Sequence, residues 1–161
     1  MAGIILIGSN KIINNIIIEN AGTTGIYING QKNTIDHVIS RYNGQSGFYL
    51  SPECDLNTFN YCFSYRNFHF IENIISDGFT VEIGAINNVF NYCFAWENSV
   101  NGFGYYYWDG KHKNGELIYS HSASWNNGNM NVFTGKYDFD NGKPLDKNML
   151  TIQQLTPFLV Y

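Results

Sequence analysis

The sequence predicts an all-β protein, a parallel β-helix, and three observations support this fold class. Five segments of eleven residues align without gaps, each ends in Asn, and the first four are each followed by Gly and a strand-like pattern. Successive segments begin 23 to 31 residues apart, a period typical of solenoids. The chain is also rich in Asn (23) and Gly (16) and only 14% charged, which disfavours a helical bundle.

The repeated segments locate the strands of each coil. They are Asn10–Asn20, Asn33–Asn43, Asn57–Asn67, Asn88–Asn98 and Leu117–Asn127. Alternation of apolar and polar residues, the pattern of a strand with one buried face, follows each of four glycines: Gly25, Gly47, Gly78 and Gly102. Each coil therefore has two or three short strands, and the chain of 161 residues predicts about five to six coils in one domain.

Stacking of the coils places equivalent residues in files that run along the solenoid. After each glycine, one file is expected to point inward: Ile26, Phe48, Phe79 and Phe103. In the preceding strand, a second inward file is expected: Ile12, Ile35, Phe59, Phe90 and either Ile118 or Tyr119. The terminal asparagines form a further inward file: Asn20, Asn43, Asn67, Asn98 and Asn127. Because an amide both donates and accepts, stacked Asn side chains can hydrogen-bond to one another and satisfy the buried turns.

The sequence predicts a capped C-terminal end and an open strand edge at the N-terminal end. Residues 1–135 form the expected β-helix, and residues 136–161 form a loop and a short helix that caps it, since a solenoid needs caps. Pro144 stands near the start of this helix, and apolar residues follow at helical spacing: Leu145, Met149, Ile152 and Leu155. At the N-terminal end, Ile4–Ile7 leaves an open strand edge. This edge predicts either a homo-oligomer or a chain that belongs to a longer solenoid.

Charge and hydropathy argue against nucleic-acid binding and against a membrane span, and the cysteines leave two alternatives open. The formal net charge is −4, which argues against nucleic-acid binding because that needs a basic face. No apolar run approaches the roughly 20 residues of a membrane span, and no signal peptide is recognised in this chain. Cys62 and Cys93 occupy one inward file in adjacent coils, as two packed thiols or as a disulfide.

A shared motif runs through the repeats: C-x-[SA]-[YW]-x-N at Cys62–Asn67 and Cys93–Asn98, with D-G-F at Asp77–Phe79 and N-G-F at Asn101–Phe103. This motif resembles that of the family nine polysaccharide lyases over roughly residues 10–135. The resemblance implies a right-handed parallel β-helix, an acidic plant polysaccharide such as pectate as partner, and an extracellular location. It also implies calcium as cofactor, with cleavage by β-elimination.

The same resemblance assigns candidate chemical residues. Asp77 matches a calcium ligand of the family, and Asn101 stands where the family carries a carboxylate. Lys136 is the nearest candidate for the base that removes the sugar proton. Glu82 replaces a family lysine and is a second catalytic candidate. Because one carboxylate and one amide make a poor calcium site, two outcomes stay open: a lyase, or a non-catalytic glycan-binding or structural module.

The outward side chains after the glycines predict a sugar-binding surface. Alternation places tyrosines, a carboxylate and a tryptophan on this outer face, beside two lysines that can meet acidic groups. These candidates are Tyr27, Tyr49, Glu82, Tyr106, Trp108, Lys111 and Lys113. Two alternatives remain: tyrosine is a good strand former on any solvated sheet, and Glu82 with Asp77, Glu97 or Asp109 can supply the carboxylate pair of a glycoside hydrolase.

Overall fold

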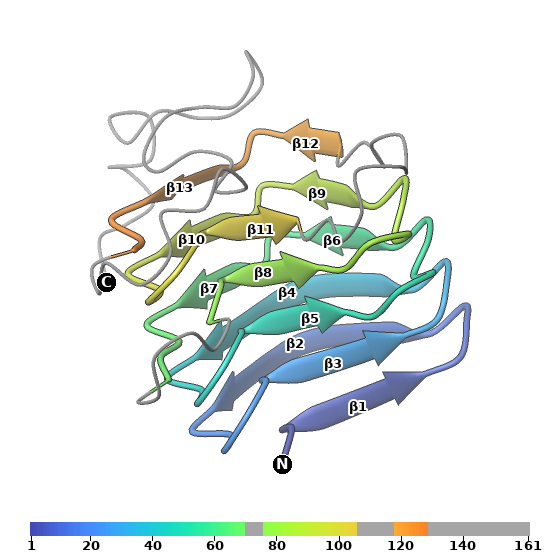
Figure 1. Cartoon of the computed structure of the whole chain (residues 1–161). Coiled ribbons are helices and arrows are strands. Elements are labelled where there is room, and N and C mark those ends of the chain that lie inside the picture. Colours follow the sequence, from blue (N-terminus) through green and yellow to red (C-terminus); the bar gives the residue numbers. More distant parts are fainter. Residues whose placement is uncertain (70–75, 106–117, 129–161) are drawn as a thin grey trace.

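The computed structural model describes residues 1–69, 76–105 and 118–128, which form five coils of a parallel β-helix (Figure 1). The first sheet has five strands, one per coil, all parallel: β1 (Ile4–Ile7), β3 (Ile26–Asn29), β5 (Phe48–Leu50), β8 (Phe79–Val81) and β11 (Phe103–Tyr105). Four of these strands, β3, β5, β8 and β11, begin directly after the four predicted glycines, and the predicted fold class is confirmed. Within the described ranges there is no helix, so none that could cross a membrane.

The second sheet holds the eight remaining strands. Its first two are long, β2 (Ile12–Glu19) and β4 (Thr34–Arg41), and later coils divide the same path in two. The divided strands are β6 (Thr58–Asn60), β7 (Phe63–Tyr65), β9 (Val89–Asn91), β10 (Phe94–Trp96), β12 (Ile118–Ser120) and β13 (Ala123–Trp125). A left-handed backbone residue bends this path in every coil: Asn15, His37, Tyr61, Tyr92 and His121.

The core is a pair of aromatic stacks that meet inside the coils. Phe48, Phe79 and Phe103 stack with ring centroids 4.6 and 4.7 Å apart, and Phe59 and Phe90 stack at 4.8 Å. All five rings are fully buried, as predicted for these files. The two stacks meet edge to face, an arrangement that adds to the burial of apolar area.

The first repeat is out of register by one residue, and two predictions for it are wrong. Strand pairing matches Ile13, not Ile12, with Ile35, so Ile12 points outward and is 71% exposed. A shift of one residue reverses which face of a strand is buried. By the same shift Asn20 is exposed and lies outside the file, and Ala21 takes the place beside Asn43. Asn20 instead adopts the left-handed conformation (φ 59°), which Asn tolerates better than most residues.

Hydrogen-bonded amides connect the coils at the turn after the second sheet. The Nδ2 of Asn43 donates to Oδ1 of Asn67 (2.9 Å), Asn67 donates in the same way to Asn98 (2.9 Å), and Asn98 donates to Asn127 (3.0 Å). Each Oδ1 also accepts the backbone N–H of the preceding member, and Asn43 accepts that of Ala21. These amides satisfy backbone groups that the buried turn would otherwise leave without partners.

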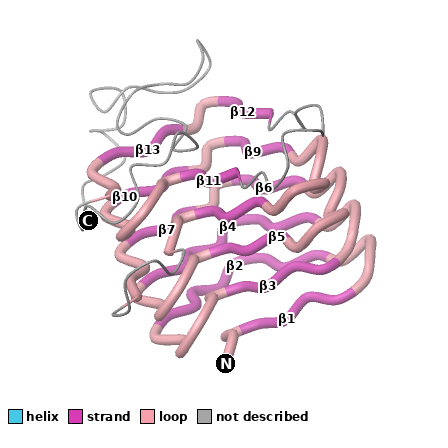
Figure 2. The backbone as a smooth tube through the Cα atoms, viewed as in Figure 1, coloured by secondary structure: helices cyan, strands magenta, loops and turns pink. Residues whose placement is uncertain are grey.

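A second file of asparagines crosses the opposite turn, although the sequence analysis did not assign it. Its members are Asn33, Asn57 and Asn88, and each Oδ1 accepts a backbone N–H from the coil before it, at 2.9–3.0 Å. The signal was available, since four of the five repeats also begin with Asn. The loops of successive coils lie directly above one another at both turns (Figure 2), so one file stands at each side of the strands.

Two further predictions concern the cysteines and the C-terminal end. Cys54, Cys62 and Cys93 are buried free thiols, so the disulfide alternative is wrong. Burial, followed by the neighbouring Cys62 thiol, raises the pKa of Cys93. The predicted cap at residues 136–161, and with it the boundary at residue 135, lies outside the described residues.

Replacing Asn67 by Ala is expected to destabilise the fold by about 2 kcal/mol, because it removes the acceptor of the buried backbone N–H of Asn43 and one acceptor of the Asn43 amide. Thermal unfolding followed by circular dichroism should show a midpoint lower by about 4–8 °C. Asn14→Ala is the matched control, since Asn14 is exposed on β2. Equal midpoints for the two variants would contradict a structural role for the file.

Candidate functional site

The outer face of the first sheet carries the predicted tyrosine row. Strand pairing aligns Tyr27 with Tyr49 and Tyr49 with Thr80, one residue from each of three successive coils. The rings of Tyr27 and Tyr49 stack with centroids 5.4 Å apart and planes at 13°. Because the two rings lie against each other, each covers part of one face of its neighbour, and both tyrosines are half-buried. Ring edges and hydroxyl groups therefore contribute more to this surface than open ring faces do.

Glu82 follows β8 directly and lies two residues beyond Thr80 in the chain. The hydroxyl of Tyr49 donates to Oε1 of Glu82 at 2.7 Å, across one coil. Glu82 is only 9% exposed, and its backbone N–H donates to the carbonyl of Leu50. Burial, and then the hydrogen bond to Glu82, raise the pKa of Tyr49, so its phenol stays protonated and remains a hydrogen-bond donor at neutral pH. We refer to Tyr27, Tyr49 and Glu82 as the tyrosine face.

Asp77 and Asn101, the predicted metal ligands, do come together, but as part of a buried turn. Oδ1 of Asp77 accepts the backbone N–H of Asn101 at 3.0 Å, and Oδ2 accepts the hydroxyl of Thr80 at 2.9 Å. The hydroxyl of Ser46 joins Thr80 at 2.6 Å, and all four residues are buried. This arrangement connects the turns of three successive coils.

The described residues do not fit a calcium ion at this point. Calcium takes six to eight oxygen ligands, whereas both carboxylate oxygens of Asp77 already accept hydrogen bonds. Within the described ranges, no three His, Cys, Asp or Glu side chains are grouped in a way that would hold a metal. We therefore derive no chemistry through a calcium ion held by Asp77 and Asn101.

The structure separates Glu82 from one of its predicted carboxylate partners. Glu97 lies on the outer side of the second sheet, where its Oε2 accepts from Nε of Arg66. The remaining candidates fall outside the described residues: Tyr106, Trp108, Asp109, Lys111, Lys113 and Lys136.

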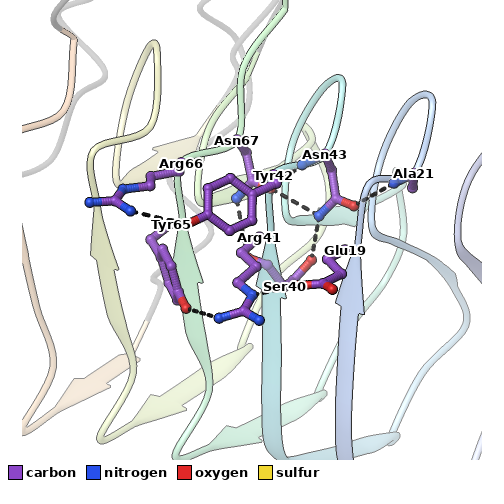
Figure 3. A network of polar contacts seen from close by, with 9 residues as sticks. All are labelled: Glu19, Ala21, Ser40, Arg41, Tyr42, Asn43, Tyr65, Arg66 and Asn67. Carbon is purple, nitrogen blue, oxygen red and sulfur yellow. Dashed lines mark hydrogen bonds and ion pairs between the residues drawn. The ribbon is translucent and has the colours of Figure 1, made fainter. Parts of the chain in front are cut away.

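A polar network that the sequence analysis missed lies on the outer side of the second sheet, next to the asparagine file (Figure 3). Arg41 at the end of β4 contacts Glu19 and Tyr65, and Arg66 after β7 contacts Glu97 and Tyr42. The signal lay in the repeats, since Arg-Tyr-Asn ends one segment and Tyr-Arg-Asn ends the next.

With this geometry in place, the comparisons with known proteins identify the family. The sequence matches the family described as "Pel9A-like, right handed beta helix region" over residues 1–143. The chain belongs to this family. The handedness predicted for the solenoid, and the predicted kinship with pectate-lyase-like β-helices, are thereby confirmed. No curated protein matches the sequence.

Among solved structures, the Pel9A-like chain is similar to the one titled "Crystal structure of pectate lyase Pel9A". The TM-score is 0.62 at 23% sequence identity, and the match covers 84% of this chain and 30% of that chain. At this identity the likeness shows the shared fold. The chain described here thus corresponds to less than a third of the length of that lyase.

Tyr49 is expected to ionise above its ordinary pKa of 10.0, because burial and the Glu82 carboxylate both disfavour the phenolate. Alkaline titration of the wild type and of Tyr49→Phe measures this directly, because the difference in phenolate absorbance between the two reports the ionisation of Tyr49. Glu82→Gln should lower the pKa of Tyr49 but leave it raised, since burial is the larger cause. The stability that the raised pKa contributes should be complete below pH 10 and decline as pH rises further. A difference signal with its midpoint at or below pH 10 would refute the buried hydrogen bond.

Proposed function

We propose that this chain binds an acidic plant polysaccharide of the pectate type on its tyrosine face. The observation that carries the proposal is the row formed by Tyr27 stacked on Tyr49 and by Tyr49 hydrogen-bonded to Glu82, on the outer face of a Pel9A-like β-helix. Each residue comes from a different coil, so the row extends along the solenoid axis. A surface of this shape suits a linear polymer better than a small ligand.

Sugar hydroxyl groups are the natural partners of this row. The phenol of Tyr27 can donate and accept, and Glu82 has a second carboxylate oxygen that can accept a sugar hydroxyl. Asn29, exposed at the end of β3, extends the row by one more amide. The carboxylates of the polymer require cations instead, and we assign this role to Lys111 and Lys113. Because pectate occurs outside cells, the proposal carries with it an extracellular location.

Binding without cleavage is the activity that the described residues favour. Elimination requires neutralisation of the sugar carboxylate and a nearby unprotonated base. Asp77 is buried and its oxygens are used within the turn, so it does not supply the first requirement. Pectate lyase activity remains the second candidate, because the solved structure with the same fold carries that title, and Lys136 is its proposed base.

Binding is tested by affinity electrophoresis in gels containing polygalacturonate. The double variant Tyr27→Phe/Tyr49→Phe keeps the stacked rings and removes two hydroxyls, each worth about 1 kcal/mol. Its affinity should fall about tenfold or more. Tyr61→Phe, an exposed stacked tyrosine at the bend of the second sheet, is the matched control and should bind like the wild type. Unchanged migration of the double variant would remove the tyrosine face from the proposal.

Cleavage is tested separately by the ultraviolet absorbance of the unsaturated sugar that β-elimination produces. The expected result is no product from polygalacturonate, with or without added calcium. If product does form, Lys136→Ala should abolish it, and an unaffected variant would reject Lys136 as the base. Release of reducing ends without this absorbance would indicate a hydrolase instead.

A further inference from the structure

Both arginines of the chain lie next to each other on the outer side of the second sheet, away from the tyrosine face. Arg41 and Arg66 belong to successive coils, and all the other basic residues except histidine are lysines. Their side chains are 30% and 52% exposed. A guanidinium differs from an ammonium in presenting a flat set of donors that matches a carboxylate. Two neighbouring guanidiniums therefore offer donors that match the geometry of carboxylate groups.

Each guanidinium is held in place by one carboxylate and one phenol. Nε of Arg41 donates to Glu19 at 2.7 Å, and its Nη1 donates to the hydroxyl of Tyr65 at 2.7 Å. Arg66 repeats this arrangement, with Nε donating to Glu97 at 2.5 Å and Nη1 donating to Tyr42 at 3.0 Å. Among the described residues, the Nη2 atoms of both arginines have no hydrogen-bond partner, so each keeps donors for a ligand.

Aromatic rings separate and support the two cations. The ring of Tyr42 lies close to both guanidiniums, 5.5 Å from the Arg41 carbon and 6.0 Å from the Arg66 carbon (Figure 3). Tyr65 stacks on Trp96 of the next coil with centroids 4.2 Å apart. These contacts limit the rotation of the arginine side chains before any ligand arrives. Less conformational entropy is then lost on binding, which favours affinity.

This network contributes little to the free energy of unfolding. Exposed ion pairs add only about 0–1 kcal/mol each, since water screens them and long side chains must be ordered. Glu19 and Glu97 contact the Nε atoms, so they orient the guanidiniums while leaving the Nη2 atoms available. The arrangement is therefore better suited to recognition than to stability.

We propose that Arg41, Arg66, Tyr42 and Tyr65 form a second polysaccharide-binding surface, which binds the carboxylate groups of an acidic sugar polymer. The two arginines come from successive coils, one register position apart, since Arg41 pairs with Tyr65, and both guanidiniums lie beside the ring of Tyr42. The two arginines can therefore bind carboxylates from neighbouring sugars of one strand that runs along the solenoid. The identity of the polymer rests on the proposed function, whereas the position of the surface does not.

The experiment is calorimetric titration of the full chain with oligogalacturonates, alongside their methyl esters. Arg41→Gln/Arg66→Gln should weaken binding of the acid form at least tenfold, because charge-assisted hydrogen bonds are lost. Arg41→Lys/Arg66→Lys keeps the charge, and should still lose most of the affinity if the planar donors matter. The methyl esters should bind wild type and variants alike. Lys32→Gln, an exposed lysine at the opposite turn, is the matched control.

Glu97→Gln gives a result that a purely structural network would not. Gln keeps an oxygen for the Nε of Arg66 and removes a negative charge, so affinity for the acid form should rise. Glu53→Gln, elsewhere on the surface, should not change this affinity.

If both arginine variants bind like the wild type while Tyr27→Phe/Tyr49→Phe is impaired, this inference falls and the proposed function stands. The opposite pattern supports this surface and rejects the tyrosine face. Absence of binding by the wild type rejects both.

Discussion

The constraint on which the structure depends is the hydrogen bonding of each turn to the coil beside it. In every described coil the chain turns through a left-handed residue, and in most an asparagine follows whose amide bonds to the next coil. A buried turn without such partners would leave several polar groups unsatisfied, at a cost of about 1–3 kcal/mol for each group. The amide files therefore hold the coils in register, and the register determines every other contact.

Once the register is set, side chains distant in sequence become neighbours in space. The buried phenylalanines stack because each occupies the same position in its coil. The same rule operates on the outside, where Tyr27 stacks on Tyr49 and Tyr65 stacks on Trp96. Both candidate surfaces thus combine residues from successive coils, and both extend along the axis. This geometry favours a repeating polymer as the ligand of a Pel9A-like β-helix.

The polar turn around Asp77 shows how a family motif can serve the fold. Its carboxylate is fully buried and bonds to Thr80 and to the backbone of Asn101, so it links neighbouring coils. A carboxylate used in this way is not available to a ligand. Among the described residues, the proposed binding therefore rests on outward side chains and not on Asp77.

The sequence by itself determined the repeat, the strand positions, the inward phenylalanine files and the family, because these depend on local spacing that every coil repeats. It did not determine the register of the first coil, where Asn20 takes the left-handed turn and Ala21 enters the file. It also did not reveal that Asp77 is enclosed or that Arg41 and Arg66 share the ring of Tyr42. Those facts arise from contacts between coils more than twenty residues apart, and only the stacked structure decides which side chains meet.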